Sequence, residues 1–448
     1  MNTAIEKRQR RHALAIFRAS LEAADPGRAI ARMLRMQDGA LAAGPHRYPL
    51  SRFRAVHLVG AGKASATMAA AVERVLGRSV TGGLVNTKYG HLAQLKKVVL
   101  HEAGHPVPDM AGVEGARRIA EIARAAGPDD LVIALISGGA SALLPLPAEP
   151  VTLEEKQETT KLLLACGATI NEINCVRKHI SAIKGGQLAR LAAPATLLAL
   201  LLSDVIGDPL DVIGSGPAAP DDSTFEGAWQ VLEKYGITAR VPAAVRERIA
   251  AGRRGEIPET PKAGDACFRK TRNLIVGSNR LAVDAAAAKA RELGYRPVVL
   301  STLIEGETRE IAAMHCAIAR EALLSGRPAK PPVCFISGGE TTVTLRGNGK
   351  GGRNMEFALA AAIALDGVDR IFAFSAGTDG TDGPTDAAGA WATGSTARRA
   401  RAAGLNPAAA LAANDSYPFF QALDGLVMTG PTGTNVMDVR LMLAGAPD

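Results

Sequence analysis

The chain alternates short aliphatic runs with longer Ala-rich stretches whose apolar residues recur at helical spacing. In the first half this pattern predicts strands at residues 55–59, 83–85, 97–100, 131–136 and 196–202, with helices at 64–76, 112–126 and 153–168. Near-continuous aliphatic strands that alternate with helices are typical of a parallel sheet covered on both faces. The first half is therefore predicted to be a Rossmann-like, doubly wound α/β domain.

A second alternating set follows a more polar region, residues 221–272, which contains Pro242, Pro258 and Pro261. It predicts strands at 272–276, 296–300, 332–336, 341–345 and 371–375, with helices at 279–294, 307–324 and 354–364. A chain of 448 residues is also too long for one ordinary core. We expect two α/β domains, at residues 1–250 and 270–448, with the active site in the cleft between them.

The net charge of +8 is concentrated in the first 54 residues, whose eleven Lys or Arg and four Asp or Glu account for +7. A basic first segment on a neutral body is more often a solvated helical face than a nucleic-acid site. Aromatic residues make up only 4% of the chain, and the three in this segment, Phe17, Tyr48 and Phe53, do not alternate regularly with the basic residues. This composition disfavours a platform for stacking bases, and we expect no nucleic-acid partner.

The Arg-rich start has two interpretations. One is a transit peptide. The other is a pair of packed helices, because an apolar stripe ends at Asp25 and Pro26 and a second begins at Ala29. We favour the helices. The longest apolar stretch, residues 192–202, is shorter than the ~20 residues of a membrane span, so no membrane partner is expected.

The cysteines are odd in number, widely spaced and without a C-x-x-C pair. Isolated thiols of this kind argue for a reducing compartment and against a zinc site or a disulfide framework. We therefore expect a cytoplasmic protein with buried thiols, at Cys166, Cys175, Cys267, Cys316 and Cys334.

The first candidate site is residues 59–65 (VGAGKAS), which follow a predicted strand and open a helix. Gly60 and Gly62 permit a tight turn, and the amides at a helix start attract an anion. The segment nearly matches a dinucleotide fingerprint, but residues 86–88 are Asn-Thr-Lys and supply no acid for a ribose. Lys63 places a cation at the predicted anion site; the alternative is a solvated loop lysine.

Each half also contains a strand that runs directly into Ser-Gly-Gly, at residues 131–144 (LVIALISGGASALL) and 332–345 (PVCFISGGETTVTL). Two glycines let the backbone approach a ligand at the carboxyl edge of a parallel sheet. The alternative is two ordinary tight turns, which the presence of one copy in each predicted domain disfavours. The candidate cofactor-binding residues in these loops are Gly60, Gly62, Ser137, Gly138, Gly139, Ser141, Ser337, Gly338 and Gly339.

Carboxylates gather in two further segments. Residues 201–209 (LLSDVIGDP) place Asp204 and Asp208 after a strand, and Gly214-Ser215-Gly216 soon follows as another amide-rich, cofactor-binding candidate. Residues 374–386 (FSAGTDGTDGPTD) carry three more carboxylates, Asp379, Asp382 and Asp386. Oxygen ligands on such loops suit Mg²⁺, whereas turn formation by Asp-Gly and Gly-Pro is the alternative.

Four glycines precede Arg353 in residues 347–353 (GNGKGGR) at the mouth of an Ala-rich helix. The Arg353 guanidinium can present a planar fork to a carboxylate or phosphate, while the loop amides cover other oxygens. Lys350 is expected to face solvent, and Glu356 to cap the helix.

Histidine gives little support for a catalytic triad, because no serine lies in G-x-S-x-G. His105 lies in a Pro-rich loop and His179 near a predicted helix end, and each has a functional and a structural interpretation. Lys178 and Lys184 are six residues apart, which is not quite one helical face; we expect one of them to reach the site.

Taken in order, the motifs resemble a known family. They are GAGKASATMA, HEAGHPVPD, ISGGASALL, NCVRKHISAIKGGQLA, LLLSDVIGDPLDVIGSGP, SGGETTVTLRGNGKGGRNMEFALA and SAGTDGTDGPTDAAGA. Together they are similar to the class II glycerate 2-kinases, in which a glycerate kinase N-terminal domain precedes a C-terminal module called MOFRL. The resemblance runs from about residue 11 to residue 443, and several motifs are long enough to be specific.

The resemblance implies phosphorylation of D-glycerate to 2-phosphoglycerate, with ATP and Mg²⁺. It also implies active-site roles for the lysine of GAGKA and the arginine of GGRN, here Lys63 and Arg353. Some members of the family are labelled hydroxypyruvate reductases of tartrate utilisation.

Phosphoryl transfer requires alignment and positive charge around the γ-phosphate rather than covalent help. We expect Lys63 and Arg353, from opposite domains, to neutralise the transferring group and the substrate carboxylate. The 137–139 and 214–216 loops would cradle the ATP phosphates. Asp204 or Asp208 would take the hydroxyl proton or hold Mg²⁺. We assign catalysis to Asp204, and the metal to Asp208, Asp379, Asp382 and Asp386.

Two rival functions stand beside this one. An NAD(P)-dependent hydroxypyruvate reductase is supported by Gly60-x-Gly62 and by the family labels, but it lacks the ribose carboxylate. A non-catalytic sugar-acid sensor would not need the carboxylates. The expected partners are therefore D-glycerate and ATP, and a homodimer is an assembly that the sequence leaves open.

Overall fold

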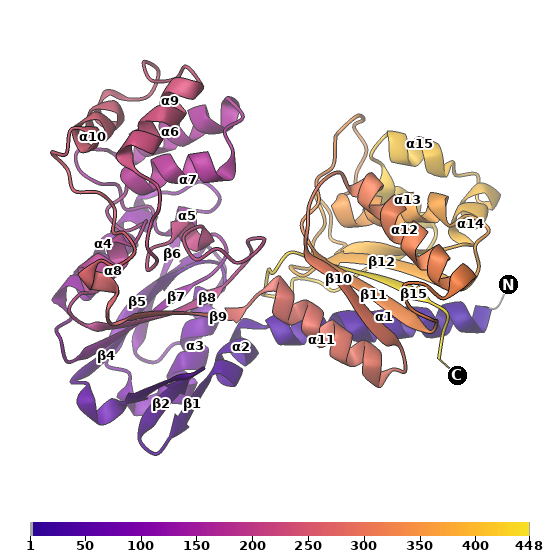
Figure 1. Cartoon of the computed structure of the whole chain (residues 1–448), viewed down its shortest axis with the longest axis horizontal. Helices are drawn as coiled ribbons and strands as arrows, with labels where there is room; N and C mark the ends of the chain where they lie inside the picture. The colour runs from indigo at the N-terminus through magenta and orange to yellow at the C-terminus, as the bar shows by residue number, and fades with distance from the viewer. Residues whose placement is uncertain (1–2, 448) are drawn as a thin grey trace. The chain divides into compact units, whose positions relative to one another are not determined.

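The computed structural model describes residues 3–447, which divide into two compact units (Figure 1). Residues 26–276 form the first, called here the Lys63 unit. Residues 277–447 form the second, the Arg353 unit, together with the first helix of the chain. The sequence placed this helix in the first domain, and the structure places it in the second unit. The boundary between the units lies at Val276 and Gly277.

The Lys63 unit is built on a six-stranded sheet of order β6-β5-β4-β7-β8-β9. Its strands are β4 (Ala55–Ala61), β5 (Gly82–Lys88), β6 (Val98–Ala103), β7 (Asp130–Ile136), β8 (Thr196–Leu202) and β9 (Thr271–Gly277). The pairs from β6 to β8 are all parallel. Every residue of β7 is buried, so the sheet is covered on both faces. The doubly wound prediction is confirmed.

Helices α4 (Met110–Ala125) and α8 (Gln187–Ala192) share a core with β4, β7 and β8. Helix α3 (Ser65–Leu76) contacts β5 and β7. The chain reverses its direction of winding between β4 and β7, which are neighbours in the sheet but distant in sequence. Open α/β sheets bind ligands at such a point, beyond the carboxyl ends of the strands.

A helical layer completes the Lys63 unit. It comprises α6 (Leu153–Ala165), α7 (Ile170–His179), α9 (Phe225–Lys234) and α10 (Ala243–Arg253), which share one apolar core. Capping boxes at Thr152 and Thr169 start α6 and α7. The polar region 221–272 was expected to mark the change of domain. Instead, residues 225–253 form two helices of the first unit, because their apolar faces pack onto α6 and α7.

The start of this unit was not foreseen. Helix α2 (Pro26–Met33) packs on α3, and a small antiparallel sheet follows, formed by β1 (Leu34–Gln37), β2 (Ala40–Ala43) and β3 (His46–Pro49). Helix α1 (Thr3–Ala24) instead packs on α11 (Asn279–Glu292) of the other unit. Both predicted N-terminal helices exist, but the expectation that they pack together is wrong.

The Arg353 unit has a mixed sheet of order β10-β11-β15-β12-β13-β14. Its strands are β10 (Arg296–Ile304), β11 (Val333–Gly339), β12 (Ile371–Gly377), β13 (Gly389–Thr393), β14 (Leu426–Val427) and β15 (Asp438–Ala444). Strand β15 lies antiparallel between β11 and β12. The predicted strand at 341–345 is absent, and only Thr342 makes an isolated bridge.

Helices cover both faces of this second sheet. Helices α1 and α11 pack on one face through Phe17 and Val283, against Phe372 and Phe374. Helices α12 (Thr308–Ser325) and α13 (Arg353–Ala364) pack on the other through a second cluster that includes Phe335 and Phe357. Three short helices complete the unit, α14 (Thr396–Ala402), α15 (Pro407–Ala412) and α16 (Ser416–Ala422).

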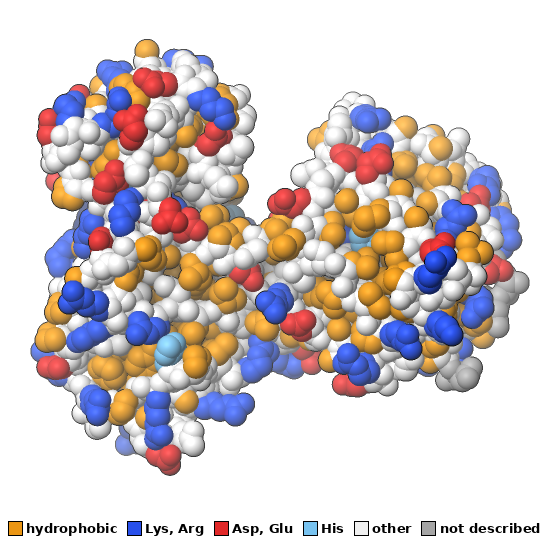
Figure 2. All heavy atoms as spheres, in the orientation of Figure 1, with side chains coloured by type: hydrophobic (Ala, Val, Ile, Leu, Met, Phe, Trp, Pro, Cys, Tyr) orange, Lys and Arg blue, Asp and Glu red, His pale blue; other side chains and the backbone are white. Residues whose placement is uncertain are grey.

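The surface gives no sign of one dominant charged face in the view of Figure 2. The Lys and Arg side chains are scattered there among acidic and apolar ones. Within residues 3–447, no helix is both long enough and apolar enough to cross a lipid bilayer.

Candidate active site

The Lys63 loop lies where β4 ends and α3 begins, and it is locked to the loop that follows β7. Gly62 has φ +137°, and a methyl group added there would overlap the Ser137 hydroxyl. The Lys63 amide donates to the Gly138 carbonyl over 2.9 Å, and the Ala64 amide donates to Ser137 Oγ over 3.0 Å. Glycine at position 62 is therefore required for this approach. The Ser137 hydroxyl is held as a structural acceptor.

Asp204 and His105 contact the Ser-Gly-Gly turn from two other strand ends. A methyl group at Gly138 would overlap Asp204 Oδ2, and one at Gly139 would lie 2.9 Å from the His105 ring and 3.4 Å from Lys63 Cγ. Four loops, after β4, β6, β7 and β8, thus bring Lys63, His105, the turn and Asp204 together. This is the carboxyl edge at which the sequence predicted a site.

The charges at this edge influence one another. Burial raises the pKa of the Asp204 carboxyl, and the nearby Lys63 ammonium opposes that rise. Burial, followed by the charge of Lys63, lowers the pKa of His105 to about 4. At neutral pH His105 is therefore an uncharged imidazole beside a lysine cation. The edge combines one cation with one carboxylate of raised proton affinity.

The Gly214–Ser215–Gly216 loop lies at the same edge, next to the segment that follows the 137–139 turn. Ser215 Oγ lies 2.8 Å from Ser141 Oγ and donates to Asn174 Oδ1 over 3.3 Å. All three residues of the loop have positive φ. Asp208 lies in the preceding turn, half-buried and with φ +55°. The two candidate phosphate loops of this unit are thus joined through a pair of hydroxyls.

Two other residues singled out in the sequence have structural roles. The Lys178 ammonium donates to Asp211 over 3.0 Å and to Asp221 over 3.1 Å. His179 lies between the Cys175 carbonyl and Glu259, whose hydrogen bonds outweigh burial and raise the pKa of His179 to about 9. Both side chains are thus engaged by neighbouring carboxylates of the same unit.

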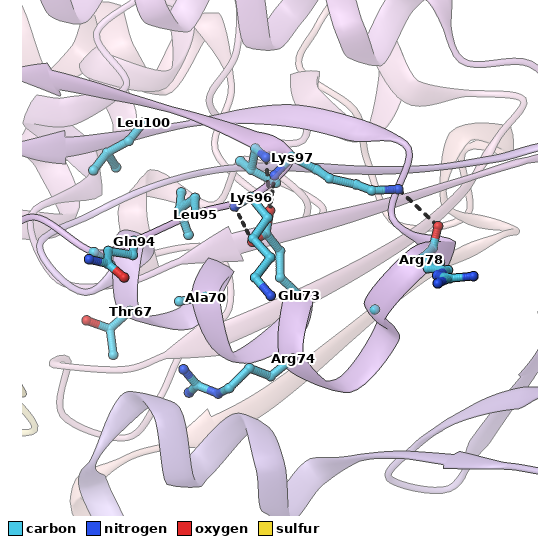
Figure 3. Close-up of a pocket in the computed structure, with 13 residues that line it drawn as sticks. Thr67, Ala70, Glu73, Arg74, Arg78, Gln94, Leu95, Lys96, Lys97 and Leu100 are labelled. Atoms are coloured by element: carbon cyan, nitrogen blue, oxygen red, sulfur yellow. Dashed lines mark hydrogen bonds between the residues drawn. The ribbon is translucent and has the colours of Figure 1, made fainter.

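A hollow on the surface of this unit lies away from the Lys63 edge (Figure 3). It measures about 1210 Å³ and is lined by the end of α3 and the segment that leads into β6. Glu73 anchors that segment by accepting hydrogen bonds from the amides of Lys96, Lys97 and Val98. No predicted site residue lines it, so we do not place the active site there.

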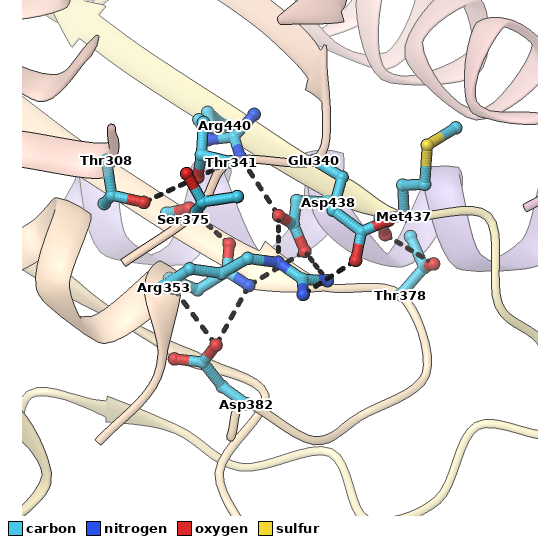
Figure 4. Close-up of polar contacts among 12 residues, drawn as sticks. Thr308, Glu340, Thr341, Arg353, Ser375, Thr378, Asp382, Met437, Asp438 and Arg440 are labelled. Carbon is cyan, nitrogen blue, oxygen red and sulfur yellow. Dashed lines mark hydrogen bonds and ion pairs between the residues drawn. The ribbon is translucent and has the colours of Figure 1, made fainter. Parts of the chain in front are cut away.

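In the Arg353 unit, Arg353 is the first residue of α13 and is engaged by two carboxylates (Figure 4). Its Nε and Nη2 donate to the two oxygens of Asp438 over 2.7 and 3.0 Å, and its Nη1 lies 2.8 Å from Glu340 Oε1. Burial acts to lower the pKa of Arg353, but Asp438 raises it above the ordinary value. The fork predicted for a substrate anion therefore already holds a buried carboxylate.

Asp438 and Arg440 are two functional-site candidates that the sequence reasoning missed. Asp438 is fully buried and also accepts hydrogen bonds from Arg440 and Asn354. Two charges two residues apart, in the otherwise apolar run VMDVRLML, were the available signal. Alternation of that kind marks a strand that carries an inward polar face.

Arg353 borders a pocket of about 510 Å³ within its own unit. Glu340, Asp382 and Asn414 line it, together with the glycine-rich loop. Asp382 is buried and accepts hydrogen bonds from the amides of Asn354 and Met355 at the start of α13. Burial raises the pKa of Asp382 to about 7, against those amide bonds. Asp382 is thus a helix cap rather than an exposed metal ligand.

Two loops of this unit differ from expectation. Ser337, Gly338 and Gly339 are not an open turn, because β11 continues through them and pairs with β15. The Ser337 hydroxyl is tied to His315 over 2.8 Å. The glycine-rich loop is also held down, since Asn414 Oδ1 accepts from the amides of Arg346 and Gly347. The amides expected to cover ligand oxygens are largely used within the protein.

The three metal carboxylates predicted in the Arg353 unit have partners within that unit. Asp379 accepts from the Thr381 amide in its own turn, and Asp386 accepts from the Tyr417 hydroxyl at the surface. Across residues 3–447, no three His, Cys, Asp or Glu side chains form a group that could hold a metal ion. Asp379, Asp382 and Asp386 are thus engaged in turn, cap and surface contacts within the Arg353 unit, and the metal site predicted from them and Asp208 stays a prediction.

Comparison with known proteins assigns the chain to a family. A model described as a domain of unknown function, DUF4147, matches residues 12–250, and the MOFRL family model matches residues 333–438. The chain is 43% identical over 432 residues to the D-glycerate 2-kinase of Thermotoga maritima, covering 96% of this chain and 97% of that one. The chain belongs to the class II glycerate 2-kinase family.

Other members of the family agree on the fold. The crystal structure of glycerate kinase from Thermotoga maritima matches with a TM-score of 0.88 at 42% identity, covering 98% of this chain and 100% of that chain. A relative from Agrobacterium vitis, 44% identical over 432 residues and covered to 93%, carries the name hydroxypyruvate reductase.

The structure does not favour the reductase name for this glycerate kinase family member. Strand β5 ends in Asn86, Thr87 and Lys88, without the acid that a nicotinamide ribose needs. The Asn86 amide is buried and donates to the carbonyls of Gly112 and Leu143. Its side chain is therefore committed to packing.

Proposed function

We propose that this protein transfers the γ-phosphate of ATP to the 2-hydroxyl of D-glycerate, releasing ADP and 2-phosphoglycerate. The observation that supports it is the grouping of Lys63 and Asp204 against the Gly138–Gly139 turn, at the carboxyl edge of the parallel sheet. A cation beside a close-packed glycine turn suits a transferring phosphoryl group. A carboxylate of raised pKa suits removal of a hydroxyl proton.

The chemical step follows from these groups. The 2-hydroxyl oxygen forms a bond to the γ-phosphorus as the bond to the β,γ-bridging oxygen breaks, and the hydroxyl proton passes to Asp204. Charge accumulates on the transferring oxygens, where the Lys63 ammonium stabilises it. Ser141 and the 214–216 loop hold the remaining phosphates by hydrogen bonds.

Arg353 is proposed to bind an anion of the reaction without releasing Asp438. Its contacts with Asp438 and Glu340 use three of the five guanidinium N–H groups. The other two can donate to a carboxylate or phosphate in the adjoining pocket. Asp438 then acts as a positioning residue that fixes the plane of the fork.

Magnesium fits this protein as an ion that arrives with the nucleotide. Mg²⁺ keeps several waters and is usually held by one or two carboxylates plus substrate phosphates. Because no three-ligand group exists among the described residues, we do not propose a metal site formed by protein ligands alone. Asp208, beside the Lys63 edge, is the proposed ligand, and Asp379 is a second candidate. When bound, the ion supplies positive charge to the phosphates.

A coupled assay tests the function directly. ADP release should depend on both D-glycerate and ATP, and phosphorus NMR should show the product phosphorylated at carbon 2. The matched control is NADH oxidation with hydroxypyruvate, which should stay at background. Hydroxypyruvate reduction without glycerate-dependent ADP release would overturn the proposal.

Replacing the proposed base should change the pH profile. For Asp204→Asn we expect a loss of about 10²- to 10³-fold in kcat, within the range of general-base contributions. The pKa of Asp204 is raised, so wild-type activity should fall as pH drops through a value above the ordinary range of aspartate. That acid limb should be absent in the variant. An unchanged profile from pH 4 to 8 would exclude Asp204 as the base.

Replacing the proposed metal ligand should change the magnesium requirement. For Asp208→Asn we expect the Mg²⁺ concentration at half-maximal rate to rise severalfold, with the rate largely recovered at saturating Mg²⁺. Asp386→Asn is the matched control, because Asp386 is exposed and bonded to Tyr417. Equal magnesium titrations for both variants and wild type would remove Asp208 from the site.

A further inference from the structure

Two lysines of the Lys63 unit are buried without partners. Lys156, on α6, is 4% exposed, and Lys184, after α7, is 0% exposed. Neither Nζ has a hydrogen-bond partner in the part of the chain that the structure describes. Both differ from the neighbouring Lys178, which is equally buried but paired with Asp211 and Asp221.

The two lysines and Arg177 form one cationic cluster. Burial, followed by the charge of Arg177, lowers the pKa of Lys156 to about 7. Burial, followed by the charges of Lys156 and Arg177, lowers the pKa of Lys184 well below its ordinary value. No ion pair among residues 3–447 includes any of the three. The cluster therefore consists of two buried lysines and the half-buried Arg177, with no carboxylate paired to any of them among the described residues.

Such a cluster is unfavourable unless a ligand completes it. A buried ammonium group without a hydrogen bond destabilises a fold by several kcal/mol, or it gives up its proton. Apolar residues of the same size would be more stable at both positions. An anion would supply hydrogen-bond acceptors to these two nitrogens, which residues 3–447 do not.

The cluster is joined to the proposed phosphate loops. The Gly185 amide, next to Lys184, donates to the Ser215 carbonyl over 2.9 Å, and the Gly186 amide donates to Gly216 over 2.7 Å. Ser215 Oγ in turn lies 2.8 Å from Ser141 Oγ and bonds Asn174 on α7. A polyanion in those loops would therefore be next to the segment that carries Lys184.

We propose that Lys156, Arg177 and Lys184 form a subsite for the polyphosphate of the nucleotide. The assignment rests on the proposed function for the identity of that nucleotide, but the anion site itself does not. A monocarboxylate such as glycerate brings one negative charge and would leave most of the cluster uncompensated. A nucleoside triphosphate brings several charges and many acceptor oxygens, and it would restore the protons to both lysines.

Inorganic tripolyphosphate is the direct probe, used with the full chain and no glycerate. Titration calorimetry at pH 8, in buffers of different ionisation enthalpy, should show binding to wild type with net proton uptake. For Lys184→Met and Lys156→Met we expect the Kd of tripolyphosphate to rise about 10- to 100-fold, as for loss of one charge-assisted hydrogen bond. The number of protons taken up on binding should be smaller in both variants than in wild type.

The matched control is Lys161→Met, an exposed lysine on the same helix as Lys156. It should bind tripolyphosphate like wild type. The buried variants should melt at or above the wild-type temperature without ligand, since a buried polar group without a partner has been removed, and lose the rise in melting temperature that tripolyphosphate gives. That pairing of results excludes misfolding as the cause.

Steady-state kinetics with ATP and D-glycerate show whether the cluster binds the polyphosphate of ATP or the carboxylate of D-glycerate. We expect the KM for ATP to rise in the buried variants while the KM for D-glycerate changes less than about twofold. A rise confined to the KM for D-glycerate would overturn the assignment in favour of the acceptor carboxylate. Unchanged tripolyphosphate binding in both buried variants would show that the cluster is not an anion site. If wild type binds tripolyphosphate but lacks glycerate-dependent ADP release, the proposed function fails and the subsite stands.

Discussion

Lys63→Met should reduce kcat by about 10³-fold and leave the fold intact. Removing one preorganised donor from a developing anionic charge typically reduces turnover by about 10²–10³-fold. Loss of the Lys63 ammonium also removes the group that opposes the raised pKa of Asp204. The variant therefore affects both the transferring phosphate and the proposed base, which places the expected loss at the upper end.

The methionine keeps the part of Lys63 that packs. The lysine Cγ would lie 3.4 Å from a methyl group on Gly139, and the Lys63 amide bond to Gly138 is backbone. Thermal melting should therefore match wild type. Lys96→Met, at an exposed lysine of the same unit, is the matched control and should keep full activity. Near-normal kcat in Lys63→Met, with ATP and D-glycerate saturating, would refute the role of Lys63.

Local patterns predicted most elements of the fold. Strand β8 begins and ends at the predicted residues, 196 and 202, because a fully buried parallel strand is a continuous aliphatic run with sharp ends. Helix α4 starts two residues before the predicted 112, at Met110, because Asp109 caps it by accepting from the Gly112 amide. Errors of this size reflect capping, which a hydrophobic pattern does not record.

Non-local pairing produced the larger errors. Strand β15 was missed although it lies between β11 and β12, because its partners are 60 or more residues away and its first residues are charged. The open Ser337–Gly339 turn was predicted for the same reason, since its amides are used only when β15 is placed beside β11. A strand that returns from the end of the chain leaves no local signal of its partners in either segment.

The same limit applies to the site. Lys63, Asp204 and the 137–139 turn could be predicted together, because parallel strands deliver their loops to one edge. The sequence left both a functional and a structural interpretation open for His105. In the structure its ring lies against Gly139, at the same edge as Lys63. The partner of Arg353 could not be predicted, because a guanidinium that binds a ligand and one that neutralises a buried aspartate look alike in sequence.

Arg353→Met should reduce both activity and stability. We expect kcat to fall about 10³-fold, because arginine that stabilises a phosphoryl-transfer transition state contributes about 10³–10⁵-fold. We also expect the free energy of unfolding to fall by about 3 kcal/mol, at the low end for breaking a buried ion pair. The low end applies because Asp438 keeps hydrogen bonds from Arg440 and Asn354. The coupled assay measures the loss of kcat, and urea unfolding measures the loss of stability.

Asp438→Asn separates the two effects. In the double variant Arg353→Met with Asp438→Asn no carboxylate at position 438 is left uncompensated, so most of the stability should return while activity stays low. Activity that returns together with stability would show that Arg353 acts only by holding Asp438.

Combining Lys63→Met with Arg353→Met then tests whether both cations act on one anion. If they do, the double variant should lose much less activity than the product of the two single losses, because groups that act as a unit are not additive. Fully multiplicative losses would mean that each cation has a separate task.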